Sequence, residues 1–267
     1  MIQNILDRIN FIENLLPELE AIAVRYFRTG KLETANKESG SGFDPVTVAD
    51  REIERTFRKA LKREFPYDSV LGEEFTDTQV AQEHHWVIDP IDGTRAFVIG
   101  SPSFAILISY EFCGTNQYSV ISQPFTQERF VSHKGQPQYS RGIGHTNTMA
   151  VSSVNHLSKA KLASTFPEIG TSQERLSFER VAEKVQLVRY GMDAYAYALL
   201  ALGHIDLVIE AGLKPFDFNA PRAVVISAGG VFCGWCGGEV GSSGQVVAAA
   251  NQELANQAVK LLMNIDP

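Results

Sequence analysis

The sequence contains few cysteines, no long apolar segment and no excess of positive charge. Its three cysteines, Cys113, Cys233 and Cys236, cannot all pair with one another, which favours a reducing compartment. No stretch approaches the roughly 18 apolar residues of a membrane helix, and residues 1–27 lack the basic start and apolar run of a signal peptide. A formal net charge of -7 argues against binding to a nucleic-acid backbone. We therefore expect a cytoplasmic protein without a membrane or nucleic-acid partner.

The chain is long enough to bury a sizeable core. Its 267 residues, with 44% hydrophobic and 21% charged content, are typical of one large globular domain or two tightly packed halves. We expect a single unit over residues 1–267, which can be subdivided into an α+β half at residues 1–140 and an α/β half at residues 141–267. An acidic protein can still bind an anionic substrate if a metal ion supplies positive charge locally.

Two helices open the chain, and alternating strands and helices follow. Apolar residues at helical spacing predict a helix over residues 1–27, which Pro17 should kink or divide, and a second helix that stops at Pro66. Residues 29–44, rich in Gly, Ser and Lys, predict a mobile loop. Further strands are predicted at 69–71, 86–88, 104–110, 119–123, 129–132, 162–165, 186–189, 206–209 and 245–249, and further helices at 173–184, 194–202, 218–228 and up to 263. Such alternation is typical of layered α/β folds.

The most informative segment places two carboxylates close together in the chain. A predicted strand ends in Asp89, and a proline-containing turn leads to Asp92 three residues later. The turn should direct both carboxylates to one point, with the Ile91 carbonyl between them. Mg²⁺ prefers such hard oxygen ligands and leaves room for water and phosphate. Backbone N–H groups of Gly93 and Thr94, at the start of the next segment, can hold a phosphate oxygen.

Further acids stand at strand ends or helix starts. Taken singly, each has an ordinary explanation: Asp50 completes a Thr-x-x-Asp capping box, Asp217 is a helix N-cap, and Glu74 is a solvated neighbour of Glu73. Together, four or five buried carboxylates would repel one another without a cation. A bound divalent metal removes this repulsion and lowers the pKa of a bound water. The set therefore favours a magnesium-dependent phosphatase that hydrolyses small phosphate monoesters.

This ordered set resembles the inositol monophosphatase superfamily of metal-dependent, lithium-sensitive phosphatases. The resemblance rests on Gly-Glu-Glu at residues 72–74, Asp-Pro-Ile-Asp-Gly-Thr at residues 89–94 and the late Asp217, and it extends in motifs over residues 44–238. It implies an αβαβα sandwich of the inositol monophosphatase and fructose bisphosphatase type, usually a homodimer. It also implies two or three Mg²⁺ ions per site, with Mn²⁺ as an alternative cofactor.

The resemblance assigns the metal ligands residue by residue. Glu73, Asp89 and the Ile91 carbonyl would bind the first Mg²⁺. Asp89, Asp92 and Asp217 would bind the second Mg²⁺. Glu73 would also hold a third, more weakly bound metal.

The same resemblance implies the catalytic and substrate-binding residues. Thr94, paired with Asp50, would orient or deprotonate the attacking water, and Glu73 would assist through its metal. The amides of Gly93 and Thr94 would hold the phosphate group. Arg95 follows them in the motif and is counted among the substrate-binding residues.

The flanking segments most resemble the histidinol-phosphate phosphatase branch of the superfamily. Thr94 is followed by Arg95-Ala-Phe-Val, where inositol phosphatases usually carry Thr-Asn-Phe. Residues 189–197 and 204–215 also resemble segments of that branch, although Met192 replaces a usual glycine.

Two more acids bear on the substrate. We place Asp193 and Glu210 on the leaving-group side of the pocket, where charge-assisted hydrogen bonds favour an ammonium or imidazole group. Their ordinary alternatives are a helix N-cap for Asp193 and a surface acid at a strand end for Glu210. L-histidinol phosphate carries both cationic groups, so its hydrolysis in histidine biosynthesis is the predicted reaction. The alternatives are inositol 1-phosphate or another sugar or nucleotide phosphate, and a non-catalytic protein that binds RNA or a transcription partner on the same fold.

Overall fold

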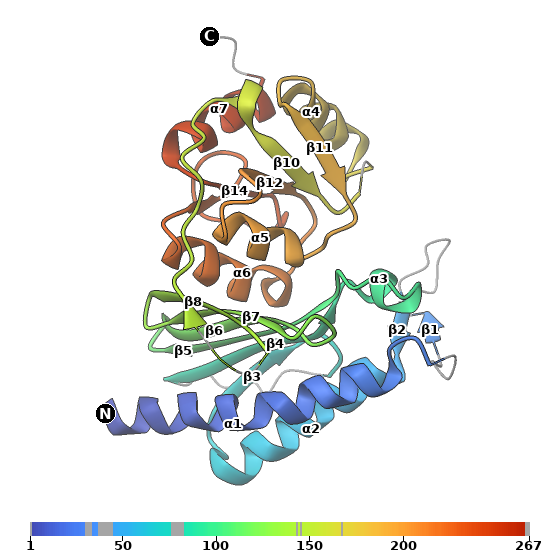
Figure 1. Ribbon diagram of the computed structural model, residues 1–267, viewed down its shortest axis with the longest axis vertical. Coiled ribbons are helices and arrows are strands. Elements are labelled where there is room, and N and C mark those ends of the chain that lie inside the picture. The colour runs from blue at the N-terminus through green and yellow to red at the C-terminus, as the bar shows by residue number, and fades with distance from the viewer. Residues whose placement is uncertain are drawn as a thin grey trace.

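The first layer of the fold consists of two long helices. The computed structural model describes residues 2–29, 34–36, 45–75, 83–142, 144, 146–166 and 168–264. Helices α1 (Ile2–Tyr26) and α2 (Val48–Glu64) lie side by side against one face of a sheet (Figure 1). Helix α1 is continuous through Pro17, so the predicted division is wrong, whereas the alternative of a kink stays a prediction. Pro17 is exposed, so water can bond the carbonyl that its missing N–H leaves free, while the opposite face of α1 stays packed in the core.

Helix α2 begins and ends where the sequence predicts. Thr47 is the N-cap, and the carboxylate of Asp50 accepts a hydrogen bond from the Thr47 backbone N at 2.9 Å, which completes a capping box. Of the predicted loop, residues 30–33 and 37–44 lie outside the described residues. The remainder includes strand β1 (Thr34–Asn36), which pairs with β2 (Pro45–Thr47) and was not predicted.

The next layer is the larger sheet. Over the described part of the chain it has seven strands in the order β3-β4-β5-β6-β7-β8-β9, and only the β3–β4 pair is parallel. Strands β8 and β9 were not predicted, because β8 is polar and lacks alternating apolar residues; its pairing with β7 orders it instead. The strands are β3 (Ser69–Gly72), β4 (His84–Asp92), β5 (Ala105–Phe112), β6 (Thr115–Gln123), β7 (Glu128–His133), β8 (Gln136–Arg141) and β9 (Thr146–Asn147).

A smaller sheet forms the fourth layer. Its order is β11-β10-β12-β14-β13, with β10 parallel to both β11 and β12. Because β10 and β12 are parallel, their carboxyl ends meet at one edge of the sheet. Strand β13 was not predicted. The strands are β10 (Lys161–Ser164), β11 (Leu187–Tyr190), β12 (Leu207–Glu210), β13 (Val231–Cys233) and β14 (Val246–Ala249).

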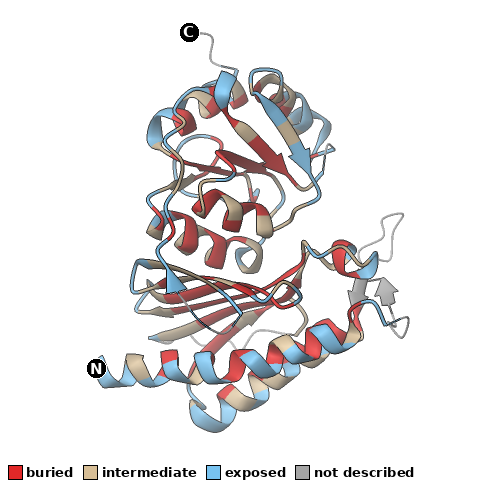
Figure 2. Cartoon of the chain, viewed as in Figure 1, coloured by how far each residue is buried: buried red, intermediate tan, exposed pale blue. Residues whose placement is uncertain are grey.

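Helices fill the space between the sheets and cover the far side. Helices α5 (Tyr195–Ala201) and α6 (Pro215–Ser227) lie between the two sheets, and α4 (Ser172–Ala182) and α7 (Gln252–Leu262) form the last layer (Figure 1). Buried residues line each of these interfaces (Figure 2). The predicted αβαβα sandwich is therefore confirmed. The division of the chain into two halves stays a prediction.

None of the described helices combines the length and apolar character that crossing a membrane requires.

Candidate active site

Strand β4 delivers two of the predicted metal ligands. Its pairing with β5 shifts register between Asp89 and Asp92. Residues three apart on a regular strand point to opposite faces, so this irregularity allows both carboxylates to face one cavity. Asp89 is buried, and its Oδ1 accepts a hydrogen bond from the Ile91 backbone N at 3.0 Å. Asp92 Oδ2 accepts one from the Ala194 backbone N at 2.6 Å, which ties β4 to the start of α5.

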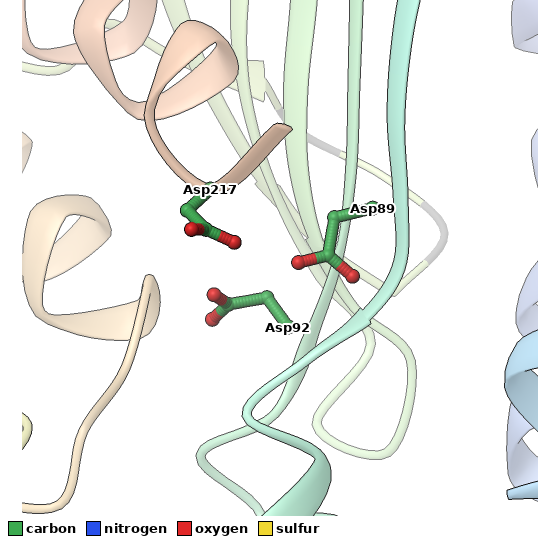
Figure 3. Close-up of side chains that lie close together, drawn as sticks. All are labelled: Asp89, Asp92 and Asp217. Carbon is green, nitrogen blue, oxygen red and sulfur yellow. The ribbon is translucent and has the colours of Figure 1, made fainter. Parts of the chain in front are cut away.

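Asp217 joins these two acids from the first turn of α6. The N-cap of α6 is Lys214, and Asp217 accepts a hydrogen bond from its backbone N at 2.6 Å, so the predicted N-cap role of Asp217 itself is wrong. One carboxylate oxygen from each of Asp89, Asp92 and Asp217 lies within 4.8 Å of the others. Figure 3 shows the three side chains pointing toward one another from β4 and α6.

The electrostatics of this cluster require a cation or protons. Burial raises the pKa of Asp89 well above its usual value, and the charges of Glu73, Asp92 and Asp217 raise it further. Burial likewise raises the pKa of Asp92, with Asp193 as the next cause. A divalent cation would offset this repulsion, and carboxylate oxygens are the donors that hard cations such as Mg²⁺ prefer. The residues present therefore fit a divalent metal.

Glu73 reaches the cavity from the loop after β3. It lines the same cavity as the three aspartates, and its effect on the pKa of Asp89 includes a side-chain hydrogen bond. Its neighbour Glu74 is not solvated as predicted, because its side chain is only 3% exposed and its Oε2 lies 3.9 Å from Arg51 Nε. This loop packs against α2, and the packing buries the Glu74 side chain.

Thr94 lines the same cavity as the cluster, and its side chain faces Asp50. Thr94 Oγ1 lies 3.0 Å from the Ile91 carbonyl oxygen and 3.5 Å from Asp50 Oδ1, so its single proton can go to either acceptor. Burial raises the pKa of Asp50 to about 7, against hydrogen bonds from Thr47 that lower it. Asp50 therefore caps α2 through one oxygen and faces Thr94 through the other. The two interpretations of this residue do not exclude each other.

Gly93 lies close to the side chain of Asp193. It adopts φ 77°, and a Cβ at this position would lie 3.0 Å from the Asp193 carboxyl carbon. Burial raises the pKa of Asp193 to about 6, and the Arg95 guanidinium partly opposes this shift. Asp193 does not cap α5, because the N-cap is Ala194, so that alternative is wrong.

Glu210 is buried at the carboxyl end of β12, so the surface-acid alternative is wrong. It accepts hydrogen bonds from the Thr165 backbone N at 2.6 Å and the Thr165 hydroxyl at 2.8 Å. Burial raises its pKa to about 8 despite these hydrogen bonds. Thr165 was not singled out from the sequence. It directly follows β10, which is parallel to β12, so the adjacent carboxyl ends of these two strands could have indicated that Thr165 lies beside Glu210.

Phe166 was also missed. Its ring is 42% exposed and lines the cavity, and the Arg95 guanidinium carbon lies 4.8 Å from the ring centroid. No pattern in the sequence distinguishes this aromatic residue from others in loops.

A single cavity of about 490 Å³ connects these groups. It is lined by Glu73, Asp89, Asp92 and Asp217, and also by Asp193 and Glu210, the two acids that we call the second acidic wall. Every predicted site residue lines it except Asp50, whose carboxylate faces Thr94. The roles assigned to these residues stay predictions. The cavity combines a carboxylate cluster suited to a divalent cation with two further acids, of which Asp193 lies near enough to Asp92 for its charge to raise the Asp92 pKa.

Known proteins share this sequence and fold. A model of the inositol monophosphatase family matches residues 9–266. The bifunctional phosphatase IMPL2, chloroplastic, of Arabidopsis thaliana is 34% identical over 96% of this chain and 75% of its own length. The histidinol-phosphatase of Mycobacterium tuberculosis is 36% identical over 70% of this chain and 72% of its own length. The structure of an inositol monophosphatase from Zymomonas mobilis superposes with a TM-score of 0.82 at 32% identity, covering 96% of this chain and 98% of that one. The chain therefore belongs to the inositol monophosphatase family, a family of phosphatases that act on phosphate monoesters.

Proposed function

We propose that this protein is a Mg²⁺-dependent phosphatase that hydrolyses L-histidinol phosphate to L-histidinol and phosphate. The observation that carries the proposal is that one cavity holds two sets of acids: a carboxylate cluster suited to cations, and the half-buried Asp193 with the buried Glu210. The similarity to a histidinol-phosphatase supports the same substrate.

The proposed cofactor is Mg²⁺, two or three ions per site, with Mn²⁺ as the alternative. Glu73, Asp89, Asp92, Asp217 and the Ile91 carbonyl would hold these ions. Bound divalent cations neutralise the carboxylates and the phosphate, and they lower the pKa of water. The lithium sensitivity implied by the family resemblance belongs to the same proposal.

The chain's own groups would position the phosphate and move the proton. The amides of Gly93 and Thr94, at the start of α3 (Thr94–Val98), would hold phosphate oxygens. The Thr94 hydroxyl, between the Ile91 carbonyl and Asp50, would orient the attacking water. Asp50, whose pKa burial raises to about 7, can accept a proton near neutral pH.

The second acidic wall would select the leaving group. Burial raises the pKa values of Glu210 and Asp193 to about 8 and about 6. A cationic ligand would restore their charge and gain charge-assisted hydrogen bonds. L-histidinol phosphate offers an ammonium and an imidazole group, whereas inositol 1-phosphate offers hydroxyl groups only.

The test compares phosphate release from L-histidinol phosphate and inositol 1-phosphate, with Mg²⁺, with and without lithium. We expect kcat/KM to be roughly a hundredfold higher for L-histidinol phosphate, equivalent to about 2.7 kcal/mol. Glu210→Gln should lose most of this preference. The matched control Glu128→Gln, at another buried glutamate, should keep it. Faster hydrolysis of inositol 1-phosphate would contradict the assigned role of the acidic wall, and hydrolysis of neither substrate would contradict the proposed reaction.

We also propose a cytoplasmic homodimer without a nucleic-acid partner. Strand β11 lies at the edge of its sheet and exposes Leu187 and Tyr190, which supports contact with a second copy. The net charge of -7 supports the absence of a nucleic-acid partner. Light scattering on the purified protein tests the dimer, and a salt-dependent RNA mobility shift would contradict the second statement.

A further inference from the structure

A buried ion pair lies beneath the loop that carries Glu73. Glu54, on α2, is fully buried, and its Oε1 accepts a hydrogen bond from Arg58 Nε at 2.7 Å one helical turn later. The Arg58 side chain is 17% exposed. A buried carboxylate is costly unless it is paired, so this ion pair calls for a structural or functional reason.

Both members of the pair also hold the backbone of the loop. Glu54 Oε2 accepts a hydrogen bond from the Glu74 backbone N at 2.8 Å. Arg58 Nη2 donates to the Phe75 carbonyl oxygen at 3.2 Å. The two residues after Glu73 are therefore fixed to α2 through one N–H and one C=O.

The start of the loop is shaped around the same pair. A Cβ at Gly72 would lie 2.2 Å from Glu54 Oε1 and 2.8 Å from Arg58 Nη2, distances at which something must move. Glycine is thus required before Glu73 for the loop to approach Glu54 this closely. Helix α2 contacts the loop directly on both sides of Glu73.

Helix α2 also supplies Asp50, one turn before Glu54. One carboxylate oxygen of Asp50 caps the helix and the other faces Thr94. A single rigid helix therefore sets the positions of two different parts of the site. A group held in place before a cation arrives binds it with a smaller ordering cost.

We propose that Glu54 and Arg58 are positioning residues of the metal site, which hold the backbone around Glu73 so that its carboxylate faces Asp89 before a cation binds. The inference rests on the proposed metal-dependent function. Residues that support metal ligands from behind typically change metal affinity by about 10–100-fold when they are replaced.

The test measures Mn²⁺ binding to Glu54→Gln by electron paramagnetic resonance and by calorimetry. We expect the affinity to fall by about 10–100-fold, and kcat to recover at saturating metal. Hydrogen exchange at the Glu74 amide of the metal-free protein should become faster in the variant, because its acceptor is weakened. The matched control is Glu52→Gln on the same helix, where the carboxylate pairs with Arg25 at the surface, and this variant should bind Mn²⁺ like the wild type.

Several outcomes would overturn the inference. These are a folded Glu54→Gln variant with Mn²⁺ affinity within about twofold of the wild type, an equal loss in Glu52→Gln, or unchanged exchange at the Glu74 amide. If Glu54→Gln does not fold, Arg58→Lys is tested instead. Lysine keeps a positive charge beside Glu54 but loses the hydrogen bond to the Phe75 carbonyl oxygen. We then expect a loss of about tenfold, and no loss would overturn the inference. A wild-type protein that binds no Mn²⁺ would instead refute the proposed function.

Discussion

Replacing Glu210 by glutamine should change how the stability of the metal-free protein depends on pH. Glu210 is 5% exposed, and burial raises its pKa to about 8 from an ordinary value of 4.5. The folded protein therefore keeps the proton that the unfolded chain releases near pH 4.5. The free energy of unfolding must then fall as the pH rises toward 8, by about 1.4 kcal/mol per pH unit for this group.

The size of the effect follows from the pH interval. From pH 6 to about pH 8 the folded wild type keeps the Glu210 proton and the unfolded chain does not, so the free energy of unfolding falls by about 3 kcal/mol, and above pH 8 this fall stops. The glutamine variant has no proton to lose at this position. Its stability relative to the wild type should therefore rise by about 3 kcal/mol between these two pH values. The buried acids that do not interact with Glu210 titrate in both proteins, so their effects cancel to first order.

Urea unfolding in the presence of a chelator, at pH 6 and pH 9, measures this difference. Glu128→Gln is the matched control. Burial alone would raise the pKa of Glu128, but the hydroxyls of Thr126, Tyr195 and Tyr139 donate to it and hold its pKa below the usual value. It is ionised at both pH values, so its replacement should shift stability equally at both. A change of less than about 1 kcal/mol for Glu210→Gln, or an equal change for Glu128→Gln, would refute the reasoning.

Three further predictions concern other parts of the molecule. Asp89→Asn should abolish turnover and weaken Mn²⁺ binding at least about tenfold while circular dichroism shows an intact fold, and near-wild-type turnover would contradict the metal assignment. Thr94→Ala should lower kcat by about 10²–10⁴-fold with little change in Mn²⁺ affinity; an unchanged kcat in steady-state assays would exclude its proton role. Arg8→Leu should lower the free energy of unfolding by about 3–5 kcal/mol, because it leaves Asp68 buried without the partner that contacts it at 2.6 Å. Urea unfolding tests this against the exposed Arg63→Leu, which should change stability by less than about 1 kcal/mol.

Features encoded by residues close together in the chain were predictable. The capping box of α2 needs only Thr47 and Asp50, and its geometry is as predicted. The spacing of Asp89 and Asp92 correctly indicated that both acids lie close together, but the predicted turn between them is wrong: β4 continues through Asp92, and a local register shift lets both face the cavity. The apolar periodicity of α1 was also sufficient for a helix, and with one face buried this helix continues past Pro17.

Features that depend on distant segments were not predictable. The Glu54–Arg58 pair looks like an ordinary surface pair on a helix, and only the approach of Gly72 and the next residues reveals that it is buried. Strand β8 carries no apolar alternation, and the neighbouring strand determines its conformation.

The sequence by itself determined the layered fold, the ordered set of acids and the family of this protein. The layered fold follows from short-range patterns, in which each residue's conformation depends on a few neighbours. The family follows from the resemblance of short motifs that carry the acids. The tertiary structure decided which acids are buried and what faces them. The pKa of Glu210 depends on Thr165, 45 residues earlier, and on the packing around both. The burial of a side chain and the charged groups near it depend on the segments that pack around it. Only the folded chain specifies where those segments lie.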